Sequence, residues 1–255
     1  MKVSCSTICY HDLRLEDVLE RIQAADFRHV ELMAVPGECH FNARTADRVK
    51  LRRLLAKHNL AAAAIHTGSL ATGEIQTRSV SYAKAAAEVS AYLGAPVVVA
   101  TAPKRGESTT KEFLATLLEL VGVLEGAGVR LAVQNLAGSL IERPEDYKAV
   151  FAHASQALVG MALDAGHFHA VGIAAADVAR AFGDRVAHVH VSDRIGEHPV
   201  PVGHGEVDFQ SLVDALAEAD YSGFLSVEVA GVDPSTMDRY GKEALEFIGR
   251  LLPGA

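Results

Sequence analysis

Short runs rich in β-branched residues or in Ala and Val alternate with longer helical patterns from one end of the sequence to the other. Eight such pairs can be counted. The predicted strands cover residues 2–7, 29–34, 60–66, 96–101, 130–135, 159–164, 186–192 and 224–229. Each run is short and mainly apolar, as expected for strands that are buried on both faces of a parallel sheet.

The segments between these runs repeat apolar residues every three to four positions, the period of a helix with one buried face. Leu15 to Ala25 and Phe113 to Leu124 show it clearly. Eight strand–helix units in 255 residues favour a closed (β/α)8 TIM barrel over an open doubly wound sheet. No linker or change in composition indicates a second domain, so we expect one barrel domain over residues 1–255.

Charge and cysteine content narrow the classes of function. The net charge is −8 and no run of Lys or Arg is present, which argues against binding to nucleic acid. No secretory signal and no apolar run long enough to cross a membrane are readable. The three cysteines, Cys5, Cys9 and Cys39, lack disulfide-framework or zinc spacing. We therefore expect a cytoplasmic protein that binds a small polar or metal-held ligand.

Polar residues stand where the predicted strands end, and active sites of such barrels lie at the C-terminal ends of the strands. These residues are Glu31, His66, Gln134, Asp164, His190 and Glu228. Residues two positions apart share a face of a strand. The inward companions are therefore Ala64, Ala132, Ala162, His188 and Ser226, while Val133, Leu163, Val189 and Val227 should face the helices. Four of the five companions are small, which predicts an open interior beneath a polar cluster.

Asp164, His190 and Glu228 come from three successive strands and should converge. Two carboxylates and an imidazole nitrogen suit Mn, Mg, Co or Zn and leave coordination positions for a substrate. Polar capping of strand ends near water is the alternative interpretation for any one of these residues.

Four segments carry a resemblance to a known family: Leu-Asp-Ala-Gly-His (163–167), His-Val-Ser-Asp-Arg (190–194), Pro-Val-Gly-His-Gly-Glu-Val-Asp-Phe (201–209) and Ser-Val-Glu (226–228). The chain resembles the xylose-isomerase-like superfamily, within it the sugar phosphate isomerase/epimerase family. That family includes ketose 3-epimerases, hydroxypyruvate isomerases and inosose dehydratases. The resemblance implies a divalent metal held by Glu, Asp, His and Glu, which map onto Gln134, Asp164, His190 and Glu228.

Gln134 departs from the family pattern because it replaces a glutamate. An amide oxygen can ligate a hard cation, but one negative charge is lost, so we expect the metal to be weakly held or absent. An amide is also no proton base near neutral pH. In the related epimerases two glutamates act from opposite faces, whereas here Glu228 alone remains. We therefore expect a carbohydrate or keto-acid isomerase, or an allied dehydratase or hydratase, that acts through an enediolate with Glu228 as single base.

Two other residues are implied in the site by the same resemblance. His167 matches a catalytic-site histidine that hydrogen-bonds substrate, and Arg194 matches a substrate-binding arginine, although a solvated surface charge is equally compatible with its position. Glu31 and His66 are expected, from their positions at strand ends, to face the mouth and contact substrate. The alternatives are that Glu31 pairs with a cation and that His66 fills the interior layer.

Three further functions stay open at this point. One is a non-catalytic or metal-free barrel that binds a sugar or a partner, which the missing glutamate favours. Another is a two-base ketose 3-epimerase. The third is an apurinic-site endonuclease, which shares the barrel but needs additional metal ligands and DNA binding, and the acidic charge balance opposes DNA binding. The resemblance also implies a homo-oligomer.

Overall fold

The computed structural model describes residues 1–35, 39–73, 76–229 and 234–252. Eight parallel strands form a closed barrel: β1 (Lys2–Ser6), β2 (His29–Val35), β4 (Ala61–Ser69), β5 (Val97–Thr101), β6 (Arg130–Gln134), β7 (Val159–Asp164), β8 (Val186–Val191) and β11 (Phe224–Val227). Pairing runs in chain order, and β1 closes the barrel by pairing with both β2 and β11. All eight predicted strands are confirmed, with ends that shift by up to three residues.

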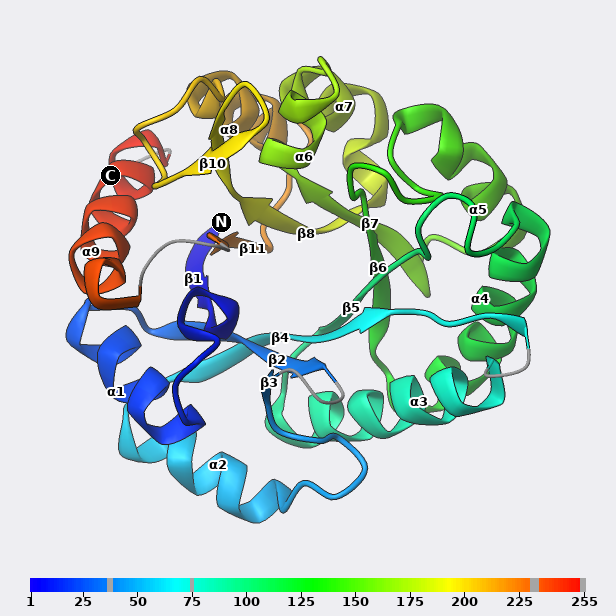
Figure 1. The fold of residues 1–255 in the computed structure, drawn as a ribbon, viewed down its shortest axis with the longest axis horizontal. Helices are drawn as coiled ribbons and strands as arrows, with labels where there is room; N and C mark the ends of the chain where they lie inside the picture. The colour runs from blue at the N-terminus through cyan, green and yellow to red at the C-terminus, as the bar shows by residue number, and fades with distance from the viewer. Residues whose placement is uncertain (36–38, 74–75, 230–233, 253–255) are drawn as a thin grey trace.

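Helices surround the strands as an outer ring (Figure 1). They are α1 (Leu15–Ala24), α2 (Arg48–Lys57), α3 (Gln76–Leu93), α4 (Thr110–Leu124), α5 (Tyr147–His153), α6 (Ala165–Ala170), α7 (Ala175–Phe182), α8 (Phe209–Glu218) and α9 (Pro234–Leu251). Short 3-10 helices cover η1 (Thr7–Tyr10), η3 (Glu125–Ala127), η4 (Pro144–Asp146) and η5 (Gly183–Arg185). The prediction placed the start of α4 at Phe113, but Thr109 and Glu112 form a capping box that starts it earlier.

Three short strands lie outside the barrel wall. β3 (Cys39–His40) pairs antiparallel with the end of β2. β9 (Asp193–Ile195) and β10 (His198–Val200) form a two-stranded hairpin after β8. We call the C-terminal end of the barrel strands the mouth of the barrel. The β9–β10 hairpin lies at this end, because it follows the end of β8.

Apolar side chains form two separate buried clusters. The larger one lies between strands and helices and contains Val133, Leu163, Val189 and Val227, as the alternation predicted. The smaller one fills the barrel interior and consists of Ala64, Val97, Val99, Ala132 and Ala162. The three alanines confirm the predicted layer of small residues. His188 and Ser226 are also fully buried. The interior therefore leaves space for polar side chains directly above the alanines.

In the described part of the chain, no helix is both long and apolar enough to cross a membrane.

Candidate active site

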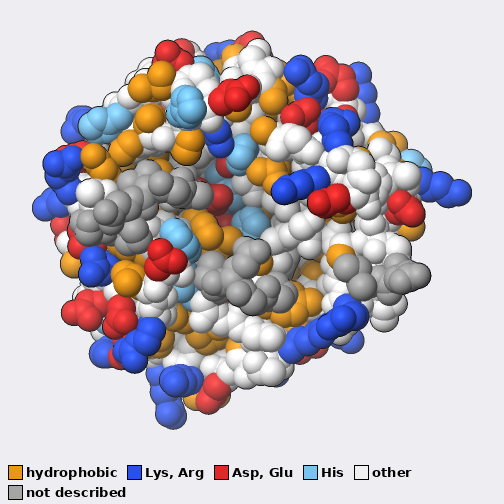
Figure 2. All heavy atoms as spheres, in the orientation of Figure 1, with side chains coloured by type: hydrophobic (Ala, Val, Ile, Leu, Met, Phe, Trp, Pro, Cys, Tyr) orange, Lys and Arg blue, Asp and Glu red, His pale blue; other side chains and the backbone are white. Residues whose placement is uncertain are grey.

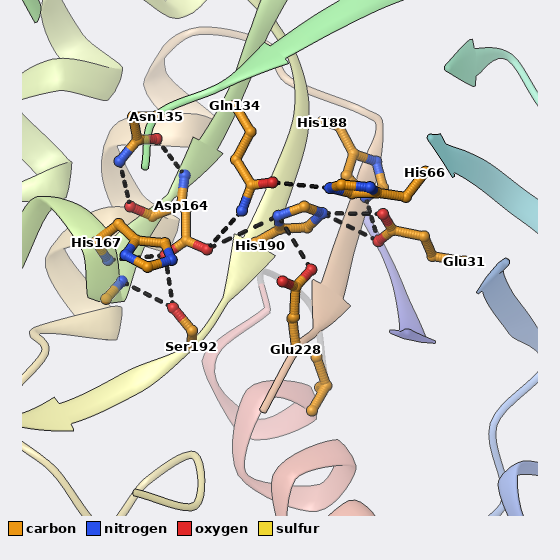
Figure 3. Close-up of polar contacts among 12 residues, drawn as sticks. Glu31, His66, Gln134, Asn135, Asp164, His167, His188, His190, Ser192 and Glu228 are labelled. Carbon is orange, nitrogen blue, oxygen red and sulfur yellow. Dashed lines mark hydrogen bonds and ion pairs between the residues drawn. The ribbon is translucent and has the colours of Figure 1, made fainter. Parts of the chain in front are cut away.

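Asp164, His190 and Glu228 meet at the mouth (Figure 3). Each offers one ligand atom, and these atoms lie within 4.8 Å of one another. His190 Nδ1 is 3.2 Å from Glu228 Oε2 and 3.8 Å from Asp164 Oδ2. Asp164 ends β7, His190 lies near the end of β8, and the Glu228 amide continues the barrel ladder by donating to the Val191 carbonyl. We call these three residues the carboxylate–histidine cluster.

The cluster has the properties of a site for a divalent cation. Both His190 Nδ1 and Glu228 Oε2 are buried and make no hydrogen bond within the described residues. A buried polar atom without a hydrogen bond is costly, and a cation placed between these two atoms, which lie 3.2 Å apart, would satisfy both. Two carboxylate oxygens and one imidazole nitrogen fit Mn, Mg, Co or Zn.

Gln134 lies beside this cluster but makes two hydrogen bonds of its own. The Gly68 amide donates to His66 Nδ1 at 3.0 Å, so a neutral His66 carries its proton on Nε2. His66 Nε2 then donates to Gln134 Oε1 at 2.9 Å, and Gln134 Nε2 donates to Asp164 Oδ2 at 3.1 Å. This chain of bonds fixes the direction of the amide, with its oxygen toward His66 and its nitrogen toward the cluster.

Asn135 has a different role, one that the sequence did not indicate. Its Oδ1 accepts from the Asp164 amide at 2.7 Å, and its Nδ2 donates to the Asp164 carbonyl at 3.0 Å. Asn135 follows β6, so the side chain extends the pairing of β6 with β7 by one step. The two adjacent carboxamides thus position the same aspartate. Gln134 bonds to the Asp164 carboxylate, and Asn135 bonds to the Asp164 backbone.

The Asp164 carboxylate is held from both sides. Oδ1 accepts from Ser192 Oγ at 2.6 Å and from the His167 amide at 2.8 Å, and the latter bond caps α6. Burial alone would raise the pKa of Asp164, but His167, His190 and these hydrogen bonds outweigh it and lower that pKa below its usual value. A side chain at Gly166 would collide with Ser192, so a glycine there lets Ser192 approach and bond to the Asp164 carboxylate.

The other two cluster members are strongly coupled. Burial favours a neutral His190, but Glu228, Glu31 and Asp164 together outweigh burial and raise the pKa of His190 to about 10. Burial, followed by Glu31 and Asp164, raises the pKa of Glu228 to about 8, against the opposing effect of His190. Without a bound cation, both groups therefore hold protons at neutral pH.

The sequence pattern predicted that the second strand ends at Glu31, but the strand continues beyond it. β2 continues to Val35 because it pairs further with β3 and β4, and Glu31 therefore lies deeper in the barrel. It is fully buried, and its carboxylate accepts hydrogen bonds from His188 and His190. His66 likewise lies inside β4, which runs on to Ser69, and stacks against His190 with ring centroids 5.9 Å apart.

His167 and Arg194 border a small pocket next to the cluster. The pocket has a volume of about 120 Å³, and Asp164 and Glu228 also line it. Arg194 Nη2 is 3.4 Å from His167 Nδ1, and Nη1 donates to the Glu197 carbonyl at 2.6 Å. Arg194 Nε is buried and has no hydrogen-bond partner within the described residues. In the space-filling view, histidine and acidic side chains are visible in the hollow at the centre of this face (Figure 2).

Asp193 holds the loop that carries Arg194. Its carboxylate accepts four backbone hydrogen bonds, at 2.8 to 3.2 Å, from Arg194, Gly203, Gly205 and Val207. Asp193 is not among the residues that the sequence predicts for the site. The spacing of Gly203 and Gly205 was the available signal, because Gly203 has a φ of +87° and a side chain at Gly205 would collide with Asp193.

Comparison with known proteins places the chain in a family. A sequence model described as xylose isomerase-like TIM barrel matches residues 19–251. An inosose dehydratase from Clostridium perfringens is 26% identical over an alignment of 164 residues, and the match covers 56% of this chain and 54% of that protein. The chain spans about half the length of the curated relatives that it matches.

Solved structures share the complete barrel. A D-tagatose 3-epimerase-like protein superposes with a TM-score of 0.79 at 20% identity, covering 98% of this chain and 99% of that one. The IOLI protein, determined with a bound zinc atom, gives a TM-score of 0.82 at 18% identity and covers 99% and 100% of the two chains. At these identities the structures show the fold alone. The family model, by contrast, spans most of the sequence: the chain belongs to the xylose isomerase-like TIM barrel family.

Proposed function

We propose that the protein catalyses the isomerisation, or an allied dehydration or hydration, of a small carbohydrate or keto acid, with Glu228 as the single base. The observation that carries this proposal is the state of the Glu228 carboxylate. Its Oε2 is buried and has no hydrogen-bond partner in the described residues, and Glu228 lines the pocket at the mouth. Burial raises the pKa of Glu228 to about 8, so its carboxylate is a stronger proton acceptor than that of an ordinary glutamate.

The other side chains around Glu228 support a reaction with one base. The Asp164 carboxylate accepts hydrogen bonds from Ser192, His167 and Gln134, so it is poorly suited to take a proton from substrate. Gln134 is an amide and cannot accept one. Removal and return of a proton on opposite faces of a carbon requires two bases, which argues against ketose 3-epimerisation. One base suffices to move a proton along a single face of an enediolate or to begin an elimination next to a carbonyl.

A divalent cation fits the carboxylate–histidine cluster, where Asp164, His190 and Glu228 would hold it. When bound, such an ion supplies Lewis-acid stabilisation of the negative charge that develops on substrate oxygens. The fold shared with a protein determined with a bound zinc atom supports this assignment. With Gln134 Oε1 engaged by His66, the three cluster residues supply two formal negative charges, which favours a weakly held ion.

Arg194 and His167 complete the proposal on the substrate side. Arg194 Nε–H has no partner in the described residues, and the guanidinium is held by the Glu197 carbonyl and beside His167. These groups donate hydrogen bonds to oxygen atoms of a ligand, while Glu228 faces the same pocket from another side. The arrangement suits a small polyhydroxy carbonyl compound oriented between a base and two donors.

His167→Ala should lower kcat/KM about tenfold and do so mainly through KM, because one substrate hydrogen bond is lost while the base remains. Steady-state kinetics at saturating metal would measure this split. His153→Ala is the matched control, since this exposed histidine ends α5 and bonds only to the Ala149 carbonyl among its described contacts. An equal effect of both changes, or a loss in kcat alone, would contradict the positioning role of His167.

Metal affinity should rise with pH. At neutral pH and without metal, His190 (pKa about 10) and Glu228 (pKa about 8) are protonated, whereas coordination requires the deprotonated forms. Binding therefore releases protons, and affinity should increase about tenfold per pH unit for each proton released. The rise becomes shallower above the pKa of Glu228 and ends above that of His190. Calorimetric titration with Mn in buffers of different ionisation enthalpy counts these protons, and a count of zero would contradict the assignment.

The proposed reaction class is tested by incubating the purified protein with Mn, Mg, Co or Zn and a panel of ketoses, keto acids and keto-inositols in D2O. NMR spectra report isomerised or dehydrated products and exchange of the proton next to the carbonyl. Product formation or deuterium incorporation that requires Glu228 supports the proposal. Binding of a sugar without either signal would instead identify a non-catalytic sugar-binding barrel.

A further inference from the structure

Glu31 is a charged side chain buried below the mouth, outside the carboxylate–histidine cluster. None of its side chain is exposed, and the same holds for His188 and His190, which are its ion-pair partners in the described residues. Its Oε2 lies 3.1 Å from His188 Nε2, and both of its oxygens lie 3.1 Å from His190 Nε2. Figure 3 shows the carboxylate beside both rings. A buried carboxylate is costly, so its position calls for a reason.

The two nitrogens of His190 have opposite surroundings. Nε2 faces Glu31, whereas Nδ1 faces Glu228 Oε2 and Asp164 Oδ2 and makes no hydrogen bond in the described residues. An ionised carboxylate accepts hydrogen bonds and donates none. A neutral His190 must therefore carry its proton on Nε2, which leaves the lone pair of Nδ1 directed at the cluster. An amide or hydroxyl in place of Glu31 would not impose this choice, because each can also donate.

We infer that Glu31 is a positioning residue that holds His190 in the Nε2–H tautomer and thereby presents Nδ1 as a ligand for the cation. This inference rests on the proposed cation site at Asp164, His190 and Glu228. Carboxylates that accept from the outer nitrogen of a ligating histidine fix the ring and increase its basicity, and their loss weakens metal binding by roughly 10- to 100-fold. His188 supplies the second hydrogen bond that holds the Glu31 carboxylate in place.

Glu31, His188 and His190 also have the composition of a second cation site, since their ligand atoms lie within 4.8 Å of one another. A cation there would use the Nε2 lone pair of His190, while Nδ1 serves the outer cluster. One ring can serve both only as an imidazolate, with both nitrogens deprotonated. A neutral ring with one proton shared with Glu31 needs no such ionisation, which favours the hydrogen-bonding role.

The test uses Zn²⁺ alone as the probe, with the full-length protein and its Glu31→Gln and Glu31→Asp variants. Calorimetry should show one zinc ion per unaltered chain, a 10- to 100-fold weaker affinity in Glu31→Gln, and partial recovery in Glu31→Asp, which keeps a carboxylate. NMR of the zinc-loaded protein with 15N-labelled histidine should show His190 ligated through Nδ1, with a slowly exchanging proton on Nε2 that is lost or weakened in Glu31→Gln. Circular dichroism confirms folding of each variant.

A control and three contrary outcomes separate the possibilities. Glu218→Gln makes the same chemical change at an exposed glutamate on α8 that pairs with Arg180, and it should leave zinc affinity unchanged. Equal zinc affinity in the unaltered protein and Glu31→Gln, with an unchanged proton on Nε2, would overturn the inference and leave the cation site intact. Two zinc ions per chain, reduced to one in Glu31→Gln, would show a second metal site instead. An unaltered protein that binds no zinc would refute the proposed cation site and this inference together.

Discussion

Glu228→Gln should reduce turnover by about 10²- to 10⁴-fold, the contribution usually made by a general base. Glutamine keeps the shape of the side chain and an oxygen able to face a cation, but it cannot accept a proton from substrate. Because the change also removes one negative charge from the cluster, turnover must be measured at saturating metal. Under that condition the loss should fall on kcat, and exchange of the substrate proton with D2O should disappear as well.

Glu218→Gln provides the matched control for this experiment. Glu218 ends α8, is exposed, and pairs with Arg180 rather than with any group at the mouth. The same chemical change there should leave kcat and proton exchange unaltered. If turnover of Glu228→Gln recovers fully as metal is added, Glu228 serves only as a ligand and the proposed base is wrong.

Gln134→Glu should tighten Mn binding by a few kcal/mol, or roughly 10²-fold, because a charged ligand interacts about twice as strongly as a neutral one. The same variant should be less stable than the unaltered protein when metal is removed. Gln134 Nε2 now donates to Asp164 Oδ2 at 3.1 Å, and a carboxylate in its place would set two negative charges against each other. Metal should therefore raise the melting temperature of the variant more than that of the unaltered protein. Calorimetric titration and thermal unfolding with and without Mn measure the two effects.

Gln210→Glu tests whether added charge alone explains such a result. Gln210 is exposed on α8 and bonds to Asp214, so this variant has the same net charge without a new group at the mouth. Its Mn affinity should match that of the unaltered protein. Tight stoichiometric Mn in the unaltered protein, or equal affinity after Gln134→Glu, would show that the amide coordinates as well as a carboxylate does or that another residue completes the site.

The barrel was predictable from the sequence because its strands and helices have different periodicities and no segment breaks the alternation. The convergence of Asp164, His190 and Glu228 followed from that fold alone, since the C-terminal ends of successive parallel strands are neighbours. The small interior layer was predictable in the same way, because Ala64, Ala132 and Ala162 stand two positions before polar residues.

The depth of Glu31 and the direction of the Gln134 amide were beyond this reasoning. The end of β2 depends on its pairing with β3, and β3 has only two residues, too few to show a periodic pattern in the sequence. The amide direction depends on the proton position of His66, which in turn depends on the Gly68 backbone. The amide direction also depends on the hydrogen bond between His66 and Gln134, which lie far apart in sequence, and residue types at single positions do not encode such a contact.

The Asp193 tether makes the loop over the pocket an exchangeable unit. The backbone amides of Gly203, Gly205 and Val207 donate to a carboxylate in the same segment. These internal bonds hold the segment in shape, so its conformation depends little on the barrel wall beneath it. The ligand atoms of the proposed cation site, by contrast, lie on or directly after β7, β8 and β11. Variation of residues 194–202 between two fixed anchor points can therefore change which molecules fit, while the chemistry delivered by the wall stays the same. Ligand specificity can therefore change through substitutions in this loop, without changes to the groups on the barrel wall.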